Sequence, residues 1–169
     1  NLDSRNFDWN KTVVSQAQFK RAELFILNQK AFIALMIVEI HKHTVKAANK
    51  NVKAASRSNG TTDILWEHIA PQLFEIFSDV QFYDYTKAPL NTRINKPENY
   101  HITYSRAETI KNQIEATKYL EAGFNAAVVF NAEKHNLPKE YLGFPVIDGD
   151  IHDMRFKDAS GSIVGLAAK

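Results

Sequence analysis

The spacing of apolar residues predicts two helices in the first third of the chain. Ser15 can cap a helix over residues 16–27, and Asn28 can cap a second helix over residues 29–50. In both segments apolar residues return every three or four positions, which is the period of an amphipathic helix. The preceding segment, residues 1–14, is polar and irregular, and we expect no regular element there.

Beyond residue 50 the pattern changes to short apolar runs that alternate with helical segments. Strands are predicted over residues 52–58, 80–85, 101–105, 125–130, 146–148, 154–156 and 162–166. Helices are predicted over residues 64–77, with an interruption near Pro71, and over residues 107–122. Such alternation is typical of βα units, so we predict an α/β fold with two leading helices. It is either a partial β/α (TIM-like) barrel or a mostly parallel sheet.

The composition fits one globular domain of moderate size. The chain has 169 residues, of which 44% are hydrophobic and 24% are charged, enough for a single core. We expect residues 15–169 to form one α/β domain. Because the sequence has no initiator methionine and stops inside a strand-like run, we expect it to be incomplete at both ends. The longest apolar run, residues 31–38, is too short to span a membrane, so we expect no membrane partner.

Cysteine content and charge narrow the chemistry further. The chain has no cysteine, which excludes disulfides, thiolate catalysis and an iron–sulfur cluster in the chain as given. The 21 basic and 19 acidic residues nearly cancel, so the net charge of +2 gives no general case for nucleic-acid binding. A stripe formed by Lys42, Lys46 and Lys50, together with Lys53, keeps nucleic-acid binding as an alternative.

A polar cluster follows most of the predicted strands. These clusters lie at residues 57–60, 84–87, 104–106, 131 and 148–150. Parallel α/β folds build their sites at the carboxyl ends of the strands. We therefore expect these separate clusters to converge on one pocket.

The richest cluster contains three carboxylates after the strand at residues 146–148. Asp148 and Asp150 share one face of an extended segment, and Asp153 can fold back from the turn beyond them. Asp148, Asp150 and His152 would suit a divalent metal such as Mg²⁺ or Mn²⁺, while any of the three aspartates could act as a catalytic acid or base. An Asp-Gly-Asp turn whose charge is neutralised by Arg155 accounts for the same residues.

Further candidate residues would bind the substrate. They are Arg57, Asn59, Tyr83, Tyr85, Lys87, Tyr104 and Arg155. The cations would neutralise a phosphate or carboxylate, free amides in the loop around Asn59 could bind an anion, and the tyrosines would orient a planar group. Packing in the core is the alternative for the tyrosines.

Several motifs occur in an order that resembles a known family. They are Asn-Gly-Thr-Thr-Asp-Ile at 59–64, Phe-Tyr-Asp-Tyr-Thr-Lys at 82–87, Asn-Tyr-His-Ile-Thr-Tyr-Ser at 99–105, Val-Ile-Asp-Gly-Asp at 146–150, Asp-Met-Arg-Phe at 153–156 and Ile-Val-Gly-Leu at 163–166. Over residues 17–169 the chain resembles uncharacterised proteins encoded by bacteriophages and mobile elements. Longer members are similar to radical S-adenosylmethionine enzymes, in which a cysteine-rich segment precedes a partial β/α barrel. The resemblance implies such a barrel, but without cysteines this chain cannot hold the cluster.

We therefore predict a phage-type enzyme that acts on a small anionic or nucleotide-like ligand at the carboxyl edge of a parallel sheet. The resemblance places it in the cytoplasm of the host cell or in the virion. A non-catalytic phage accessory or virion structural protein is one alternative, and a nucleic-acid-binding protein is another. The sequence leaves the oligomeric state open.

Overall fold

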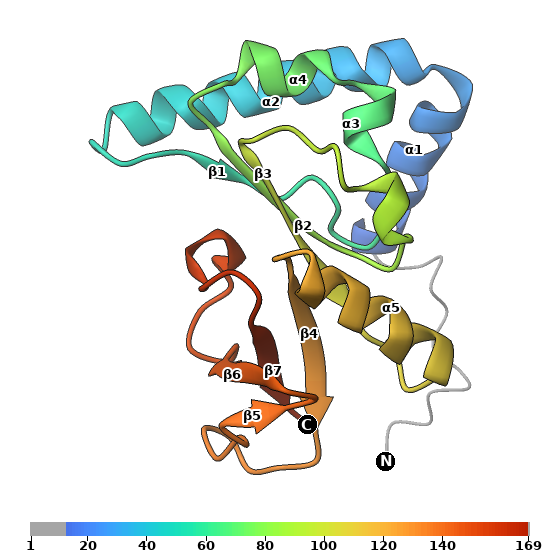
Figure 1. Ribbon diagram of the computed structural model, residues 1–169. Coiled ribbons are helices and arrows are strands. Elements are labelled where there is room, and N and C mark those ends of the chain that lie inside the picture. Colours follow the sequence, from blue (N-terminus) through green and yellow to red (C-terminus); the bar gives the residue numbers. More distant parts are fainter. Residues whose placement is uncertain (1–12, 169) are drawn as a thin grey trace. The chain divides into compact units, whose positions relative to one another are not determined.

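The computed structural model describes residues 13–168, which fall into two compact units (Figure 1). The first unit spans residues 1–50 and contains α1 (Val13–Leu27) and α2 (Gln29–Ala48). The Asn28 side chain caps α2 by accepting a hydrogen bond of 3.1 Å from the backbone N–H of Ala31. Both predicted helices are confirmed, but α1 begins at Val13, so Ser15 lies inside the helix and the predicted cap at Ser15 is wrong. Most of the predicted irregular segment, residues 1–14, lies outside the described residues.

The second unit spans residues 51–169 and is built on a seven-stranded sheet. Its strands are β1 (Ala55–Ser56), β2 (Gln81–Thr86), β3 (Tyr100–Ser105), β4 (Asn125–Phe130), β5 (Glu140–Tyr141), β6 (Phe144–Asp148) and β7 (Ile163–Ala167). They lie in the order β1-β2-β3-β4-β7-β6-β5. All neighbouring strands are parallel except the pair β5–β6. The predicted α/β fold with a mostly parallel sheet is confirmed.

The strand order differs from that of a β/α barrel. In a barrel each strand lies beside the next βα unit around a closed ring. Here β7 lies between β4 and β6, and the described sheet ends in edges at β1 and β5. Of the two architectures expected from the sequence, the structure supports the open, mostly parallel sheet.

Helices cover one face of the sheet. They are α3 (Trp66–Ile69), α4 (Gln72–Ile76) and α5 (Ile110–Glu121), with the short 3-10 helix η3 (Leu90–Thr92) beside them. Phe74 of α4 packs against Phe82 and Tyr100, with ring centroids 4.8 Å away in each case. Tyr119 of α5 stacks on Tyr104 at 4.8 Å. The break between α3 and α4 falls at Pro71, as predicted, because proline has no N–H for a helical hydrogen bond.

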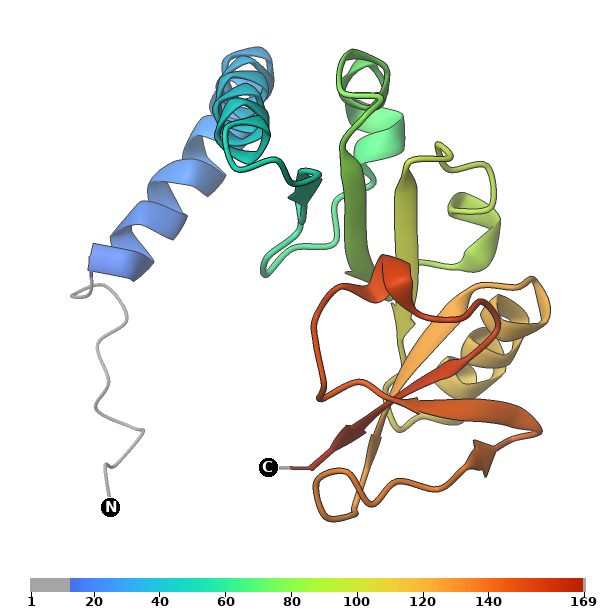
Figure 2. The same cartoon turned by 90° about the vertical axis from the view of Figure 1, so that its left-hand side faces the viewer.

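The connection from β6 to β7 covers the opposite face of the sheet (Figure 2). It contains the 3-10 helix η4 (Arg155–Lys157), whose Phe156 packs edge to face on Tyr83 with centroids 5.3 Å apart. Tyr83 and Phe82 are neighbours on β2, and successive strand residues point to opposite faces. The second unit therefore has three layers: helices, sheet and this long connection.

Some element boundaries predicted from the sequence are wrong. The predicted strand at residues 154–156 is the turn η4, closed by hydrogen bonds from Lys157 N–H to the Met154 carbonyl and from Asp158 N–H to the Arg155 carbonyl. The predicted strand at residues 52–58 shrinks to β1, because only Ala55 and Ser56 pair with β2. The two-residue strand β5 is too short to leave a periodic pattern in the sequence.

Within residues 13–168, no helix combines the length and the apolar character needed to cross a membrane.

The connection between β6 and β7 leaves the sheet at Gly149, where side chains and backbone approach closely. A Cβ atom at Gly149 would lie 2.5 Å from Val164 Cγ1 and 2.9 Å from the carbonyl oxygen of Gly165. We expect Gly149→Ala to lower the free energy of unfolding by about 1–3 kcal/mol, the usual range for overpacking.

Gly60 provides the matched control, because an added Cβ there would meet nothing within 4 Å. We expect Gly60→Ala to change stability by about 0.5 kcal/mol or less. Urea denaturation followed by tryptophan fluorescence measures both variants. Equal midpoints for the two variants would contradict the close approach at Gly149.

Candidate functional site

A cleft of about 590 Å³ opens at the carboxyl edge of the sheet in the second unit. Its lining consists of Arg57, Tyr85, Ser105, Ala127, Gly149, Asp150, His152, Asp153 and Leu166. These residues come from the segment after β1, from β2, β3, β4 and β7, and from the connection after β6. The volume suits a small-molecule ligand. Four of the five polar clusters predicted to converge contribute a residue to this cleft.

Arg57, Tyr85 and Asp153 form a compact group in the cleft. Arg57 Nη1 donates a hydrogen bond of 3.0 Å to Asp153 Oδ2, and the Tyr85 hydroxyl lies 3.5 Å from Asp153 Oδ1. The Arg57 guanidinium also lies over the Tyr85 ring, 4.9 Å from its centroid. Burial raises the pKa of Tyr85 to about 12, so its hydroxyl is a hydrogen-bond donor at neutral pH.

Asp150 lies in the cleft, but its neighbour Asp148 turns to another partner. Asp150 Oδ2 accepts a hydrogen bond of 3.0 Å from the backbone N–H of Ala167. Asp148 accepts one from the Asp150 N–H and pairs with His135 Nδ1 at 2.5 Å. Because a carboxylate only accepts, His135 must donate from Nδ1. The hydrogen bond from His135, followed by the one from Asp150, lowers the pKa of Asp148.

The guanidinium of Arg155 is fully buried beside two residues of the cleft wall. Arg155 Nη2 donates to the Gly149 carbonyl at 3.3 Å and lies 3.2 Å from His152 Nδ1. Arg155 Nη1 forms an ion pair of 3.3 Å with Asp158. Since arginine only donates, His152 accepts at Nδ1 and carries its proton on Nε2. The Arg155 side chain is only 1% exposed, and its contacts hold Gly149 and His152 in the cleft wall.

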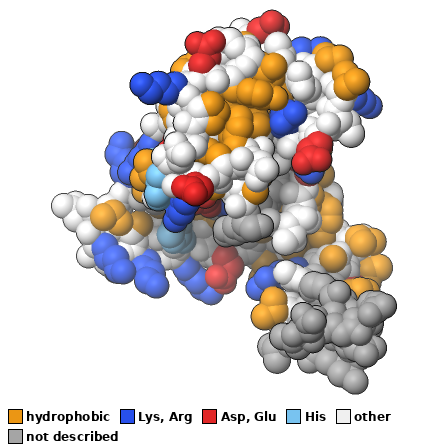
Figure 3. Space-filling view, turned by 90° about the horizontal axis from the view of Figure 1, so that it is seen from below, with side chains coloured by type: hydrophobic (Ala, Val, Ile, Leu, Met, Phe, Trp, Pro, Cys, Tyr) orange, Lys and Arg blue, Asp and Glu red, His pale blue; other side chains and the backbone are white. Residues whose placement is uncertain are grey.

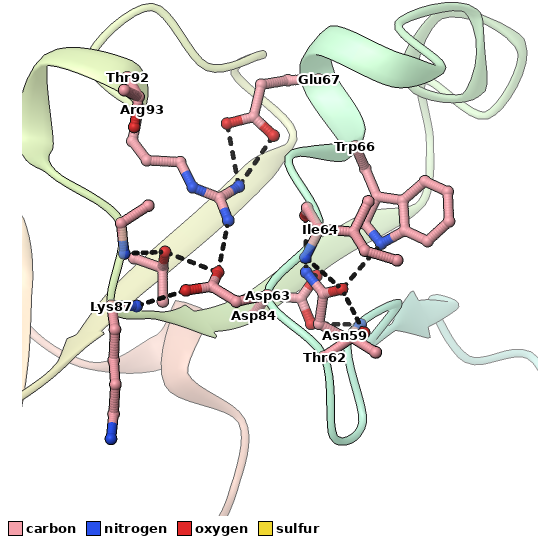
Figure 4. A network of polar contacts seen from close by, with 12 residues as sticks. Asn59, Thr62, Asp63, Ile64, Trp66, Glu67, Asp84, Lys87, Thr92 and Arg93 are labelled. Atoms are coloured by element: carbon pink, nitrogen blue, oxygen red, sulfur yellow. Dashed lines mark hydrogen bonds and ion pairs between the residues drawn. The ribbon is translucent and has the colours of Figure 1, made fainter. Parts of the chain in front are cut away.

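Besides Arg155, which is buried behind the wall, four of the residues predicted to bind substrate do not line the cleft. Tyr83 packs on Phe156 beneath the connection, and Tyr104 points to the helical face, where its hydroxyl donates to Asn112 Oδ1. Lys87 is exposed, and its side chain extends away from the polar network drawn in Figure 4. The fourth, Asn59, belongs to that network.

Asn59 holds the segment after β1 against β2 (Figure 4). Its backbone N–H donates to Asp84 Oδ1 at 2.8 Å, and its side-chain amide donates to the Ile64 carbonyl at 2.9 Å. Its Oδ1 accepts from the Thr62 hydroxyl, the Ile64 N–H and the Trp66 indole. Since Asn59 is buried and these groups use its hydrogen-bonding capacity, its side chain supports the fold of this loop.

Asp84 is the buried partner of Asn59, and it lies on the helical face of β2. Besides Asn59 it accepts a hydrogen bond of 2.8 Å from the Tyr100 hydroxyl. Burial raises the pKa of Asp84 to about 6, although hydrogen bonds from Tyr100 and Asn59 oppose this shift. Asp84 therefore anchors the loop that follows Arg57 to the strand that carries Tyr85.

A second anchor of the same loop is the fully buried Arg93 (Figure 4). Arg93 Nη1 donates to both carboxylate oxygens of Glu67, and Nη2 donates to Asp63 at 2.8 Å. Asp63 also accepts from the Thr86 hydroxyl and the Lys87 N–H at the end of β2. Charge pairing of this kind compensates the charge of a buried guanidinium and connects the loop, α3 and the end of β2.

The structure does not gather the predicted metal ligands. Among residues 13–168, no group of three or more histidine and carboxylate side chains is placed to hold a metal ion. Asp148 pairs with His135, and Asp150 accepts from the backbone of β7. The accepting Nδ1 of His152 is already occupied by Arg155. The predicted trio therefore has its ligand atoms directed to separate partners.

Two residues with reactive side chains near this edge are not among the site residues predicted from the sequence. Ser105 was part of a predicted cluster but was not named as a site residue, although it lines the cleft. His135 lies 13 residues before Asp148, in a loop with a positive φ of 65°. A positive φ is uncommon for a residue other than glycine. No local spacing rule connects His135 to Asp148, so only the fold reveals the pair.

The stripe proposed for nucleic acid is partly neutralised within the first unit. Lys42 Nζ forms an ion pair of 3.0 Å with Glu39, one turn earlier on α2. On the face shown in Figure 3, basic side chains lie among acidic and apolar ones. This mixture agrees with the small net charge of +2.

The raised pKa of Asp84 predicts a specific pH dependence of stability. An unfolded aspartate titrates near 3.8, so the contribution of folded Asp84 is fully present below that pH and is lost as the pH rises through about 6. The difference corresponds to roughly 3 kcal/mol. We expect Asp84→Asn to gain this amount relative to wild type between pH 4 and pH 7, measured by urea denaturation.

His101 also makes stability depend on pH, with the opposite sign to Asp84. The comparison with Asp84→Asn is therefore needed to isolate the contribution of Asp84. Burial, with the charges of Lys96 and Arg155, lowers the pKa of His101 to about 4, so this residue destabilises the fold as the pH falls below its ordinary value of 6.5. His101 contributes equally to wild type and to Asp84→Asn, so it cancels in the difference. Parallel stability curves for the two proteins would contradict the assignment to Asp84.

The His135–Asp148 pair makes a second prediction. Removing the donor with His135→Gln should raise the pKa of Asp148 toward its ordinary value, because the hydrogen bond from His135 is the largest cause of the depression. Titration of the carboxyl carbons by NMR measures this. His41→Gln, on α2 in the first unit, is the control and should leave Asp148 unchanged. An unaltered Asp148 titration in His135→Gln would refute the pairing in solution.

Comparison with known proteins gives one match. No curated protein and no solved structure matches the chain. The sequence matches the Gene product 88 family over residues 7–169. This match covers nearly the whole chain, including every residue of the cleft, and agrees with the phage family expected from the motifs. The chain therefore belongs to the Gene product 88 family of phage-type proteins.

Proposed function

We propose that the protein is a phage-type enzyme that binds a small anionic or nucleotide-like ligand in the cleft at the carboxyl edge of its sheet. The supporting observation is convergence: a cation, an aromatic hydroxyl, a serine and an aspartate from four separate segments line one small-molecule-sized space. The proposal places the activity in the cytoplasm of the host cell.

In this proposal the residues that line the cleft contact different parts of the ligand. Arg57 is a planar cation suited to a phosphate or carboxylate. Its cation–π contact with Tyr85 holds the guanidinium in place, and the Tyr85 hydroxyl adds a donor. Ala127 and Leu166 add apolar surface to the same cleft. An anionic group at Arg57 and a planar or apolar body across the sheet are therefore the features that this ligand would need.

Asp150 is the proposed acid or base. The hydrogen bond from the Ala167 N–H orients its carboxylate in the cleft, and residues 13–168 offer it no ion-pair partner. A carboxylate held this way can accept a proton from a ligand or from water and return it. Binding of Mg²⁺ or Mn²⁺ by Asp148, Asp150 and His152 stays a prediction, and no step of the proposal depends on it.

Substitutions at Arg57 and Asp150 separate binding from chemistry. We expect Arg57→Gln to weaken binding of inorganic phosphate or a nucleoside monophosphate about tenfold or more, because a charge-assisted contact is lost. Asp150→Asn should retain binding but abolish turnover in a screen of phosphate esters and nucleotides. NMR titration measures affinity, and melting temperatures confirm that both variants fold.

Lys139→Gln is the matched control, since Lys139 is exposed and lies outside the cleft lining. It removes one positive charge, as Arg57→Gln does, and should leave affinity unchanged. Wild-type protein that binds none of these anions at millimolar concentration would refute the proposal. Copurification with phage particles would then favour a virion or accessory protein, and salt-sensitive oligonucleotide binding would favour a nucleic-acid-binding protein.

A further inference from the structure

We propose that Arg57 and Tyr85 form an oxyanion subsite that Asp153 fills in the free protein, and that a carboxylate or phosphate of the ligand displaces Asp153. This inference rests on the proposed function and specifies how the same cleft recognises its ligand. It also assigns Asp153 a role other than the catalytic one expected from the sequence.

The contacts of the Asp153 carboxylate are those that a bound anion would make. Its two oxygens meet two different donors, with Arg57 Nη1 at 3.0 Å and the Tyr85 hydroxyl at 3.5 Å. A planar carboxylate and the oxygens of a phosphate both fit such a pair of donors. Because Tyr85 keeps its proton at neutral pH, it donates to any oxyanion in this position. Asp153 thus marks where the anionic group of a ligand would lie.

The segment that carries Asp153 is anchored on both sides of its tip. On one side the Gly149 N–H donates to the Gly165 carbonyl at 2.8 Å, and Asp150 accepts from Ala167. On the other side Arg155 is fully buried. Displacement of Asp153 therefore needs movement of residues 151–154 only, while the rest of the connection keeps its place.

The tip itself is weakly packed. Ile151 is 69% exposed and Met154 is 39% exposed, although both are apolar. The Asp153 side chain is 60% exposed, so water can replace its contacts at small cost. Exposed ion pairs contribute little, and a ligand oxyanion that forms the same contacts gives Arg57 and Tyr85 an equivalent partner. Asp153 therefore acts as a weak internal competitor.

The test is the effect of Asp153→Asn on anion affinity. Without the competing charge, we expect the dissociation constants for inorganic phosphate and for acetate to fall about two- to fivefold, the range set by an exposed ion pair. The double variant Asp153→Asn/Arg57→Gln should bind as weakly as Arg57→Gln alone, because both effects act through one subsite. NMR titrations with the two anions in parallel show whether carboxylate or phosphate is preferred.

Glu133→Gln is the control, since it removes one exposed negative charge outside the cleft lining. It should leave both dissociation constants unchanged, whereas an equal gain in affinity would attribute the effect to overall charge and overturn the inference. Unchanged or weaker binding by Asp153→Asn, with wild-type binding still lost in Arg57→Gln, would overturn it while the proposed function stands. Absence of anion binding in wild type and Asp153→Asn alike would overturn both.

Discussion

The buried carboxylate of Asp84 is the interaction on which the cleft depends. It is almost fully removed from water, and a group in that position must be hydrogen-bonded. Its partners are the Asn59 backbone and side chain and the Tyr100 hydroxyl, so Asp84 holds the loop after β1 against β2. Arg57 lies two residues before Asn59 in that loop. The position of the cationic end of the cleft is therefore set by a polar contact on the opposite face of the sheet.

Successive side chains of β2 point to opposite faces of the sheet, so this one strand both anchors the loop after β1 and contributes to the cleft. Asp84 points to the helices, whereas Tyr85, the next residue, lines the cleft. Arg155 has the equivalent role on the cleft face, because its buried guanidinium holds Gly149 and His152 in the wall. Two buried charged groups, one on each side of the sheet, thus fix the two walls of the cleft. The ion pair between Arg57 and Asp153 in this cleft is more exposed, so these two residues can exchange partners, as a binding site requires.

The sequence predicts the strands and their polar ends well, because a period of two and a polar terminus are local properties. It does not reveal which face of a strand the helices cover, since that depends on how the chain crosses over. Tyr85 and Tyr104 therefore look equivalent in the sequence, yet Tyr104 is buried against Tyr119 and Tyr85 lines the cleft. The same limit explains Asn59, a polar loop residue that becomes a buried anchor. His135 is beyond any local rule, because its partner belongs to another strand end.

The aspartates at the end of β6 and in the β6–β7 connection each have a protein partner among the described residues. Asp148 pairs with the His135 imidazole, Asp153 with the Arg57 guanidinium and Asp158 with the Arg155 guanidinium, so each of these three carboxylates has a partner of its own in the second unit. Such pairing removes the mutual repulsion that a shared metal ion would otherwise relieve. Asp150 is the exception, because the partner it accepts from is the neutral backbone N–H of Ala167. Asp150 is therefore the residue at which we place the proposed acid or base, and Asp153 is the one that we propose a ligand displaces.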